Sequence, residues 1–133
     1  KTSHEIACPV GAFFFMRKKA LDQVGLLDEQ FFMYGEDIDL AYRIKEAGWK
    51  IVYTPNTKIT HLKGASGINK KVKDKLTPEA KLQRVKTTKA FFEAMKIFYQ
   101  KNYRKRYIFL LRWLVLLGID FFKVIKIVKI KLS

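Results

Sequence analysis

Three stretches of the chain repeat apolar residues at the spacing of a helix. Residues 36–48 place Leu40, Ile44 and Ala47 on one face, and the run ends at a glycine, as helices often do. Residues 77–99 begin with Thr-Pro-Glu, which is typical of an N-cap followed by proline at the first helical position. Residues 104–132 are strongly apolar. We therefore predict a helix in each of these three stretches, two of them in the second half of the chain.

The remaining stretches have the composition of strands, turns and loops. Residues 6–16 are apolar and aromatic with an internal proline and glycine, which predicts a buried strand entered through a turn or a kink. Residues 50–54 and 57–61 are β-rich and flank a proline turn, which predicts two more strands. Residues 20–24 predict a short helix closed by glycine. Residues 63–75 mix glycine and serine with lysine and predict a mobile loop.

Composition limits the class of protein. The chain has 133 residues, of which 49% are hydrophobic, so it can bury the core of one ordinary domain and is not a disordered chain. Because it begins at Lys1 and not at methionine, we expect a segment of a longer protein. A signal-peptide pattern is lacking, which makes the cytosolic side the expected location. The single cysteine, Cys8, lies in an apolar stretch and is predicted to be a small buried side chain without chemistry.

The formal net charge of +15 favours partners that carry phosphate: nucleic acid, anionic lipid or nucleotide. In the predicted helix at residues 104–132, four basic residues fall within one narrow arc at about 100° per residue: Lys105, Arg112, Lys123 and Lys126. The longest uncharged run, Trp113 to Ile119, is much shorter than the roughly 18 residues of a membrane-spanning helix. We therefore expect a helix that lies peripherally on the cytoplasmic face of a membrane, with its lysines toward anionic headgroups. A core helix of a further domain is the alternative.

Three acids stand at the start of the first predicted helix, which is unusual in so basic a chain. Glu36, Asp37 and Asp39 lie in the first turn, where free backbone N–H groups and the helix dipole stabilise carboxylates. That stabilisation alone is enough to explain them. Asp37 and Asp39 form an Asp-x-Asp pair, but positions i and i+2 of a helix point about 200° apart and cannot readily share one metal ion. A single carboxylate held at a helix start next to the flexible Gly35 could instead act as a general base.

Several motifs follow one another in a specific order: GAFFFMR at 11–17, VGLLDEQFF at 24–32, GEDIDL at 35–40 with Arg43 and Gly48, and His61 with GAS at 64–66. This order resembles the second half of the catalytic domain of family 2 glycosyltransferases, closest to the bacterial rhamnosyltransferase-like branch. The resemblance implies an α/β fold: the C-terminal part of a GT-A-type, Rossmann-like domain, with a mixed sheet and helices, followed by long C-terminal helices. Residues 1–75 would be the catalytic part and residues 76–133 the helical, membrane-associating part.

The resemblance also implies a reaction and its residues. Asp37 would deprotonate a hydroxyl of a glycan or lipid-linked acceptor in an inverting displacement on a nucleotide-sugar donor. His61 would approach a divalent metal, Mn²⁺ or Mg²⁺, or the diphosphate, although a strand-end histidine with a backbone partner explains it equally well. The candidate substrate-binding residues are Glu36, Gly11, Ala12, Lys63 and Ser66. Because the chain lacks the upstream nucleotide-binding half with its own Asp-x-Asp, we expect it to need that half for the donor, the metal and turnover.

Two other classes of function compete with the enzyme. The lysines and aromatic residues of the second half could bind nucleic acid through phosphates and base stacking. However, Phe91, Met95 and Phe98 have the spacing of a packed helix face, and no nucleic-acid motif is present, so nucleic acid is disfavoured. A membrane-tethered assembly module without catalysis is the third class, and it predicts that Asp37 can be replaced without consequence.

Overall fold

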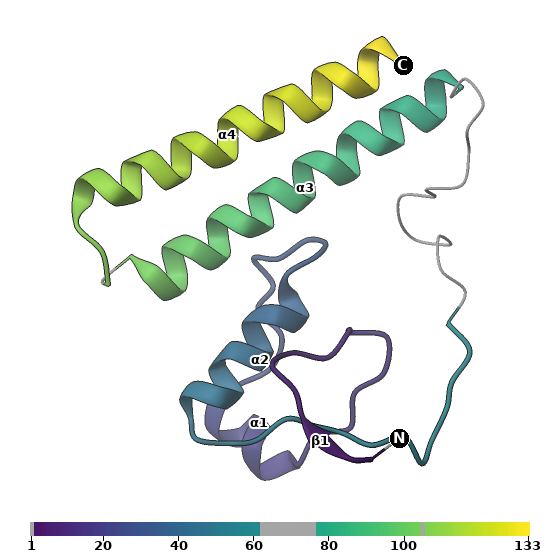
Figure 1. Cartoon of the computed structure of the whole chain (residues 1–133), viewed down its shortest axis with the longest axis vertical. Coiled ribbons are helices and arrows are strands. Elements are labelled where there is room, and N and C mark those ends of the chain that lie inside the picture. Colours follow the sequence, from purple (N-terminus) through teal and green to yellow (C-terminus); the bar gives the residue numbers. More distant parts are fainter. Residues whose placement is uncertain (1, 62–76, 105) are drawn as a thin grey trace. The chain divides into compact units, whose positions relative to one another are not determined.

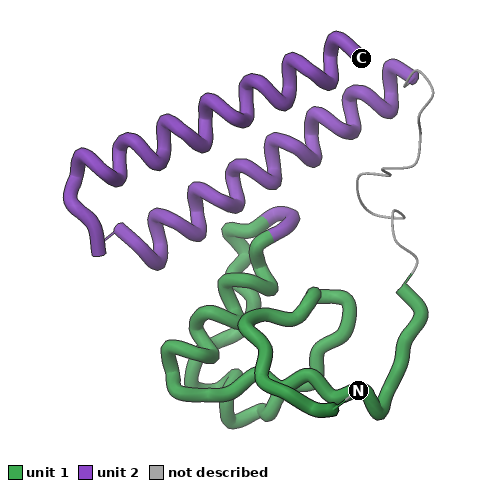
Figure 2. Tube along the Cα trace, viewed as in Figure 1, with its two compact units in different colours: residues 1–31, 35–61 green, residues 32–34, 62–133 purple. Residues whose placement is uncertain are grey.

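The computed structural model describes residues 2–61, 77–104 and 106–133 (Figure 1). The chain divides into two compact units (Figure 2). Unit 1 comprises residues 1–31 and 35–61, and unit 2 comprises residues 32–34 and 62–133. The predicted loop at residues 63–75 lies outside the described residues.

The helices of unit 1 form where the sequence predicts them. α1 (Lys18–Val24) is the short helix closed by glycine, and α2 (Glu36–Glu46) is the amphipathic helix. α2 begins after Gly35, whose φ of 88° lies in the left-handed region that glycine adopts without strain. The apolar face of α2 is buried together with one residue of α1 and one of the loop between the helices, and these side chains make the core of the unit: Leu40, Ala41, Ile44, Ala20 and Phe31.

The strands of unit 1 form one short antiparallel pair. β1 (His4–Glu5) pairs with β2 (Val52–Tyr53), and the N–H of Ile6 extends the ladder by donating to the carbonyl oxygen of Ile51 at 2.9 Å. β2 lies inside the predicted strand at residues 50–54 and confirms it in shortened form. The described residues contain this pair and no other strand, so the expected mixed sheet is not seen among them.

The predicted strands at residues 6–16 and 57–61 are wrong. Residues 6–16 hold a turn in which the N–H of Phe13 donates to the carbonyl oxygen of Val10, and residues 57–61 have no regular structure. The side chain of Phe15 is 89% exposed. Apolar and β-branched composition favours a strand only where a neighbouring strand accepts the backbone hydrogen bonds. Apart from the single bond of Ile6, neither stretch has such a neighbour among the described residues.

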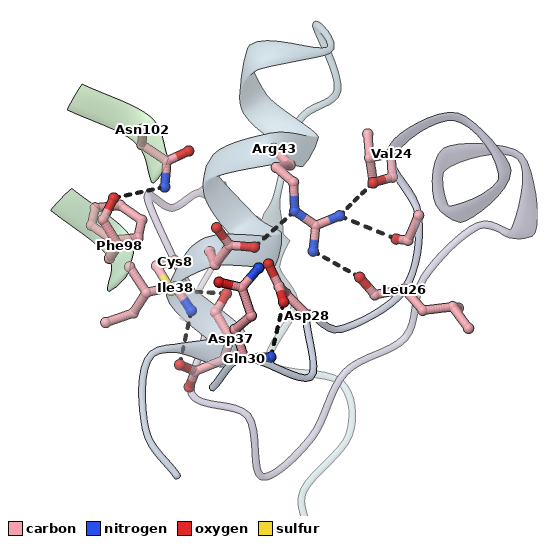
Figure 3. Close-up of polar contacts among 12 residues, drawn as sticks. Cys8, Val24, Leu26, Asp28, Gln30, Asp37, Ile38, Arg43, Phe98 and Asn102 are labelled. Atoms are coloured by element: carbon pink, nitrogen blue, oxygen red, sulfur yellow. Dashed lines mark hydrogen bonds and ion pairs between the residues drawn. The ribbon is translucent and has the colours of Figure 1, made fainter. Parts of the chain in front are cut away.

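A buried ion pair joins α2 to the segment that follows α1. Asp39 is fully buried and accepts a hydrogen bond from Nε of Arg43, one helical turn later, at 2.8 Å. The guanidinium of Arg43 also donates to the carbonyl oxygens of Val24 and, at 2.7 Å, of Leu26 (Figure 3). Its planar fork of donors can serve one carboxylate and several carbonyl groups at once. The Arg43 clamp, comprising these contacts, therefore fixes the path of the chain from α1 toward α2.

Unit 2 is a hairpin of two long helices, α3 (Pro78–Tyr103) and α4 (Phe109–Leu132), which pack side by side (Figure 1). The N-cap prediction for α3 is confirmed, because Oγ1 of Thr77 accepts a hydrogen bond from the N–H of Ala80. The long C-terminal helices are likewise confirmed. α4 begins at Phe109, and Lys105, the first residue of the predicted basic stripe, lies outside the described residues.

One acid joins the two helices of the hairpin. Oδ2 of Asp120, on α4, accepts a hydrogen bond from Nζ of Lys96, on α3, at 2.7 Å, and Oδ1 accepts one from Nζ of Lys123 at 2.5 Å. The hydrogen bond from Lys123 and then that from Lys96 lower the pKa of Asp120 below its ordinary value. A lowered pKa keeps Asp120 ionised down to a lower pH than a free aspartate, and the contact is lost only when the pH falls through that lowered value.

Neither this hairpin nor unit 1 has, among its described residues, a helix that is both long enough and apolar enough to cross a bilayer.

The Arg43 clamp makes Asp39 the acid whose neutralisation should cost most in stability. We expect Asp39→Asn to lower the free energy of unfolding of unit 1 by about 3 kcal/mol, because it leaves the charge of the largely buried Arg43 unbalanced. The measurement is urea unfolding followed by Trp49 fluorescence in a Trp113→Phe background, where Trp49 is the remaining tryptophan. The control is Asp22→Asn, which breaks the exposed pair with Lys18 and should cost less than about 1 kcal/mol. Equal losses in the two variants would contradict the structural role of the clamp.

Candidate active site

Asp37 lies in the first turn of α2 and uses both of its carboxylate oxygens. Oδ1 accepts a hydrogen bond from the N–H of Ile38 at 2.8 Å (Figure 3). Oδ2 accepts one from the N–H of Gly11 at 2.9 Å. Gly35, the N-cap residue, has no side chain with which to cap the helix. The carboxylate of Asp37 therefore stabilises the helix start and is held in one orientation by two main-chain donors.

Gly11 reaches Asp37 because residues 10–13 form a turn rather than the predicted strand. The turn leaves Gly11 and Ala12 exposed and brings the N–H of Gly11 to the helix start. A Cβ at position 11 would lie 3.2 Å from Oδ2 of Asp37, which is closer than an ordinary van der Waals contact. The approach of the main chain to the carboxylate thus depends on the missing side chain. Two of the predicted site residues, Gly11 and Asp37, are brought together.

The carboxylate of Asp37 keeps capacity for a further partner. Each oxygen of an ionised carboxylate offers about two lone-pair sites, and each oxygen of Asp37 has one main-chain donor. The side chain is neither buried nor fully exposed, so a hydroxyl group can approach it from solvent. The arrangement can therefore accept a proton from an incoming hydroxyl while the main-chain bonds keep the carboxylate in place.

The other two acids of the cluster have different surroundings. Asp39 belongs to the Arg43 clamp, so the two carboxylates of the Asp-x-Asp pair have different partners, as the i, i+2 spacing predicts. The i, i+4 spacing of Asp39 and Arg43 is the signal in the sequence that could have indicated this pair. Glu36 is half-buried, and within the described part of the chain its Oε2 is enclosed without a hydrogen-bond partner.

Cys8 lies next to Asp37, and its predicted burial is wrong. The residue is exposed, and its Sγ lies 3.9 Å from the main-chain oxygen of Asp37. Partial desolvation of the sulfur, and after it the negative charge of Asp37, raise the pKa of the thiol. Nothing in the sequence indicated this neighbour, because residues 8 and 37 are brought together only by the path of the chain around α2.

The candidate ligands of a metal or a diphosphate are not brought together. His61 is exposed and lies in a segment without regular structure, so its predicted place at a strand end is wrong. Among residues 2–61, 77–104 and 106–133, no three side chains of the metal-binding types His, Cys, Asp and Glu form a group that could hold an ion. Lys63 and Ser66, the candidate contacts to the leaving group, lie outside the described residues.

Comparison with known proteins identifies the family to which the chain belongs. A family model described as "Glycosyltransferase like family 2" matches residues 1–77, which is more than half of the chain, so the chain belongs to this family. The match confirms the family that the order of motifs indicates.

Particular relatives point to one branch of the family. The chain is similar to the N-acetylglucosaminyl-diphospho-decaprenol L-rhamnosyltransferase of Mycobacterium tuberculosis, in strains CDC 1551 / Oshkosh and ATCC 25618 / H37Rv. In each case it is 45% identical over 56 residues, which are 42% of this chain and 18% of the relative. The chain therefore spans less than a fifth of the length of the curated relatives it matches. No solved structure matches it.

The raised pKa of Cys8 offers a test of the site that needs no substrate. Thiol alkylation requires the thiolate, so iodoacetamide should label Cys8 at a higher pH than it labels an ordinary cysteine. Asp37→Asn removes a negative charge that raises this pKa, so the profile of labelling rate against pH should move to lower pH. The measurement is mass spectrometry of the labelled chain between about pH 7 and about pH 10. Asp22→Asn is the control and should leave the profile in place, and a profile unchanged by Asp37→Asn would show that the charge of Asp37 does not reach the thiol.

Proposed function

We propose that the chain is part of an inverting glycosyltransferase in which Asp37 is the general base. The observation that carries the proposal is the carboxylate of Asp37, which is oriented by the N–H groups of Gly11 and Ile38 and can still accept a proton. Membership of the glycosyltransferase family gives this carboxylate a reaction to serve.

The proposed reaction is a single displacement. As an acceptor hydroxyl approaches the anomeric carbon of the donor sugar, its proton passes to an oxygen of Asp37. The hydroxyl oxygen forms a bond to the anomeric carbon while the bond from that carbon to the nucleoside diphosphate breaks, so the configuration inverts. Gly11 holds Oδ2 of Asp37 throughout, which makes it a positioning residue in this proposal, and its contact with the substrate stays a prediction. Glu36 and Ala12 stay candidates for contact with the substrate, as do Lys63 and Ser66.

The proposed substrates follow from the relatives. Those enzymes are named as L-rhamnosyltransferases of N-acetylglucosaminyl-diphospho-decaprenol. By analogy, we propose a nucleotide-sugar donor, transfer of a rhamnosyl or other hexosyl group, and a glycan or lipid-linked acceptor in the synthesis of a cell-surface polysaccharide or glycolipid. The site of action in this proposal is the cytoplasmic face of the membrane. The donor is bound by a nucleotide-binding half, which is not among the described residues.

A divalent ion, Mn²⁺ or Mg²⁺, belongs to the same proposal, with its ligands in that nucleotide-binding half. The described residues do not themselves fit a metal site, because no three ligand side chains among them meet. We therefore assign no step of the reaction to the ion, and His61 is kept as a candidate contact only.

Replacement of the base tests the proposal in the full-length enzyme. Asp37→Asn should lower sugar transfer by about 10²–10⁴-fold, the usual loss when a general base is removed. Stability should fall by about 1 kcal/mol, because an asparagine can accept only one of the two main-chain hydrogen bonds with its oxygen. Turnover is measured at saturating donor and acceptor and scaled to the folded fraction.

Asp22→Asn is the control for this variant, since Asp39 is unsuitable as a buried member of the Arg43 clamp. A folded Asp37→Asn enzyme with near wild-type turnover would refute the catalytic role. The acid cluster would then be a helix start, and a membrane-tethered assembly module would become the better description.

Gly11→Ala tests the positioning of the base. The added Cβ lies close enough to Oδ2 of Asp37 to displace the carboxylate by a few tenths of an ångström, so kcat should fall by roughly tenfold while the KM for the donor changes little. The control is Gly118→Ala, because a Cβ there meets nothing within 4 Å and alanine favours a helix. A kcat unchanged by Gly11→Ala would show that the turn does not orient the base.

A further inference from the structure

Two charged residues of α4, Asp120 and Lys123, lie on the side of the helix that packs against α3. Asp120 binds Lys96 of α3, and Lys123 binds Asp120 on the same side of α4. Ile119, the buried residue of α4, lies on this side as well. α3 and α4 lie side by side (Figure 1), and a helix can turn only one side toward its neighbour, so the ion pairs fix the rotation of α4 about its axis.

Another side of α4 is apolar and exposed. Seven large apolar residues that share this side form what we call the outer face: Leu110, Trp113, Leu114, Leu117, Phe121, Val124 and Val128. Arg112, Lys123 and Lys126 lie on the other half of the helix, whereas Asp120 lies at the edge of the outer face, about 20° from Trp113 around the helix axis. At 1.5 Å per residue the outer face extends for about 27 Å. An apolar surface of this length is unfavourable in water and marks an interaction site.

Basic residues surround the two ends of the outer face. Beyond its C-terminal end, Lys129 and Lys131 are exposed on the last turn of α4, and Arg104 and Arg106 are exposed before the helix begins. The single acid of α4, Asp120, is already paired with two lysines. Both ends of the outer face are therefore positively charged. α4 itself has no further acid to offset this charge.

The apolar outer face and the basic residues at its ends together indicate the kind of partner that binds there. A second copy of the chain would bring its own basic residues against these, which opposes association through the outer face. A bilayer with anionic lipid accepts apolar side chains in its acyl region and basic side chains among its headgroups at the same time. We propose that the outer face of α4 docks, parallel to the surface, onto a lipid bilayer that contains anionic lipid. This inference goes beyond the catalytic proposal and does not depend on the role of Asp37.

Trp113, on the outer face, reports docking directly. In a Trp49→Phe background it is the remaining tryptophan, and it is 52% exposed in the free chain. Phosphatidylcholine vesicles with added phosphatidylglycerol should shift its emission to shorter wavelength, and brominated lipid should quench it. Vesicles of phosphatidylcholine alone should bind at least about tenfold more weakly, and salt should reduce the difference. Bound chain with unquenched Trp113 would overturn the proposal, because contact would then occur through another surface.

Variants separate the outer face from other exposed apolar residues. Leu114→Gln, Leu117→Gln and Phe121→Gln together should weaken partitioning onto these vesicles by about 100-fold or more, with helical circular dichroism unchanged. The matched control replaces three exposed residues of unit 1, Phe15, Leu26 and Leu27, by glutamine and should bind like the parent. Undiminished partitioning of the first variant would overturn the proposal. A dimer that forms without lipid and is abolished by the first variant would overturn it in favour of a second copy. The Asp37→Asn chain should bind vesicles normally, so failure of the catalytic proposal would be seen separately.

Discussion

The ion pair between Asp39 and Arg43 is the contact on which the geometry of unit 1 depends. The side chain of Asp39 is fully buried, and the guanidinium of Arg43 that it binds also donates to main-chain carbonyl groups of the segment after α1. Without it, the first turn of α2 would have no fixed relation to the segment that packs beside it. The carboxylate of Asp37 projects from that same turn, so its meeting with Gly11 depends on a residue pair that takes no part in the proposed chemistry.

Unit 2 uses an ion cluster for a different purpose. In the α3–α4 hairpin, Asp120 and its two lysines decide which side of α4 is covered, while the apolar residues of the outer face stay at the surface. A hydrophobic side would ordinarily be expected to turn inward. The hairpin instead places the ion cluster of Asp120 between its helices and presents the apolar outer face outward, an arrangement that suits a partner more apolar than water.

The sequence predicted what depends on nearby residues and missed what depends on distant ones. α2 and α3 were predictable because their spacing, caps and terminal glycine are local signals. The strand at residues 6–16 was not, because a strand needs a partner and periodicity does not show whether one is present. The acid cluster and the family were also readable from residue order. The donor from Gly11, the neighbouring Cys8 and the rotation of α4 were not, since each joins residues that are more than 20 positions apart.

The hydrogen bond from Gly11 to Asp37 has a donor that does not titrate. A lysine or a histidine in that place would gain or lose its proton as the pH changed, and the orientation of the carboxylate would change with it. A main-chain amide keeps its hydrogen throughout the range in which proteins fold. Any change of this contact with pH must therefore originate in the carboxylate itself, so the group that orients the proposed base adds no ionisation of its own to the chemistry.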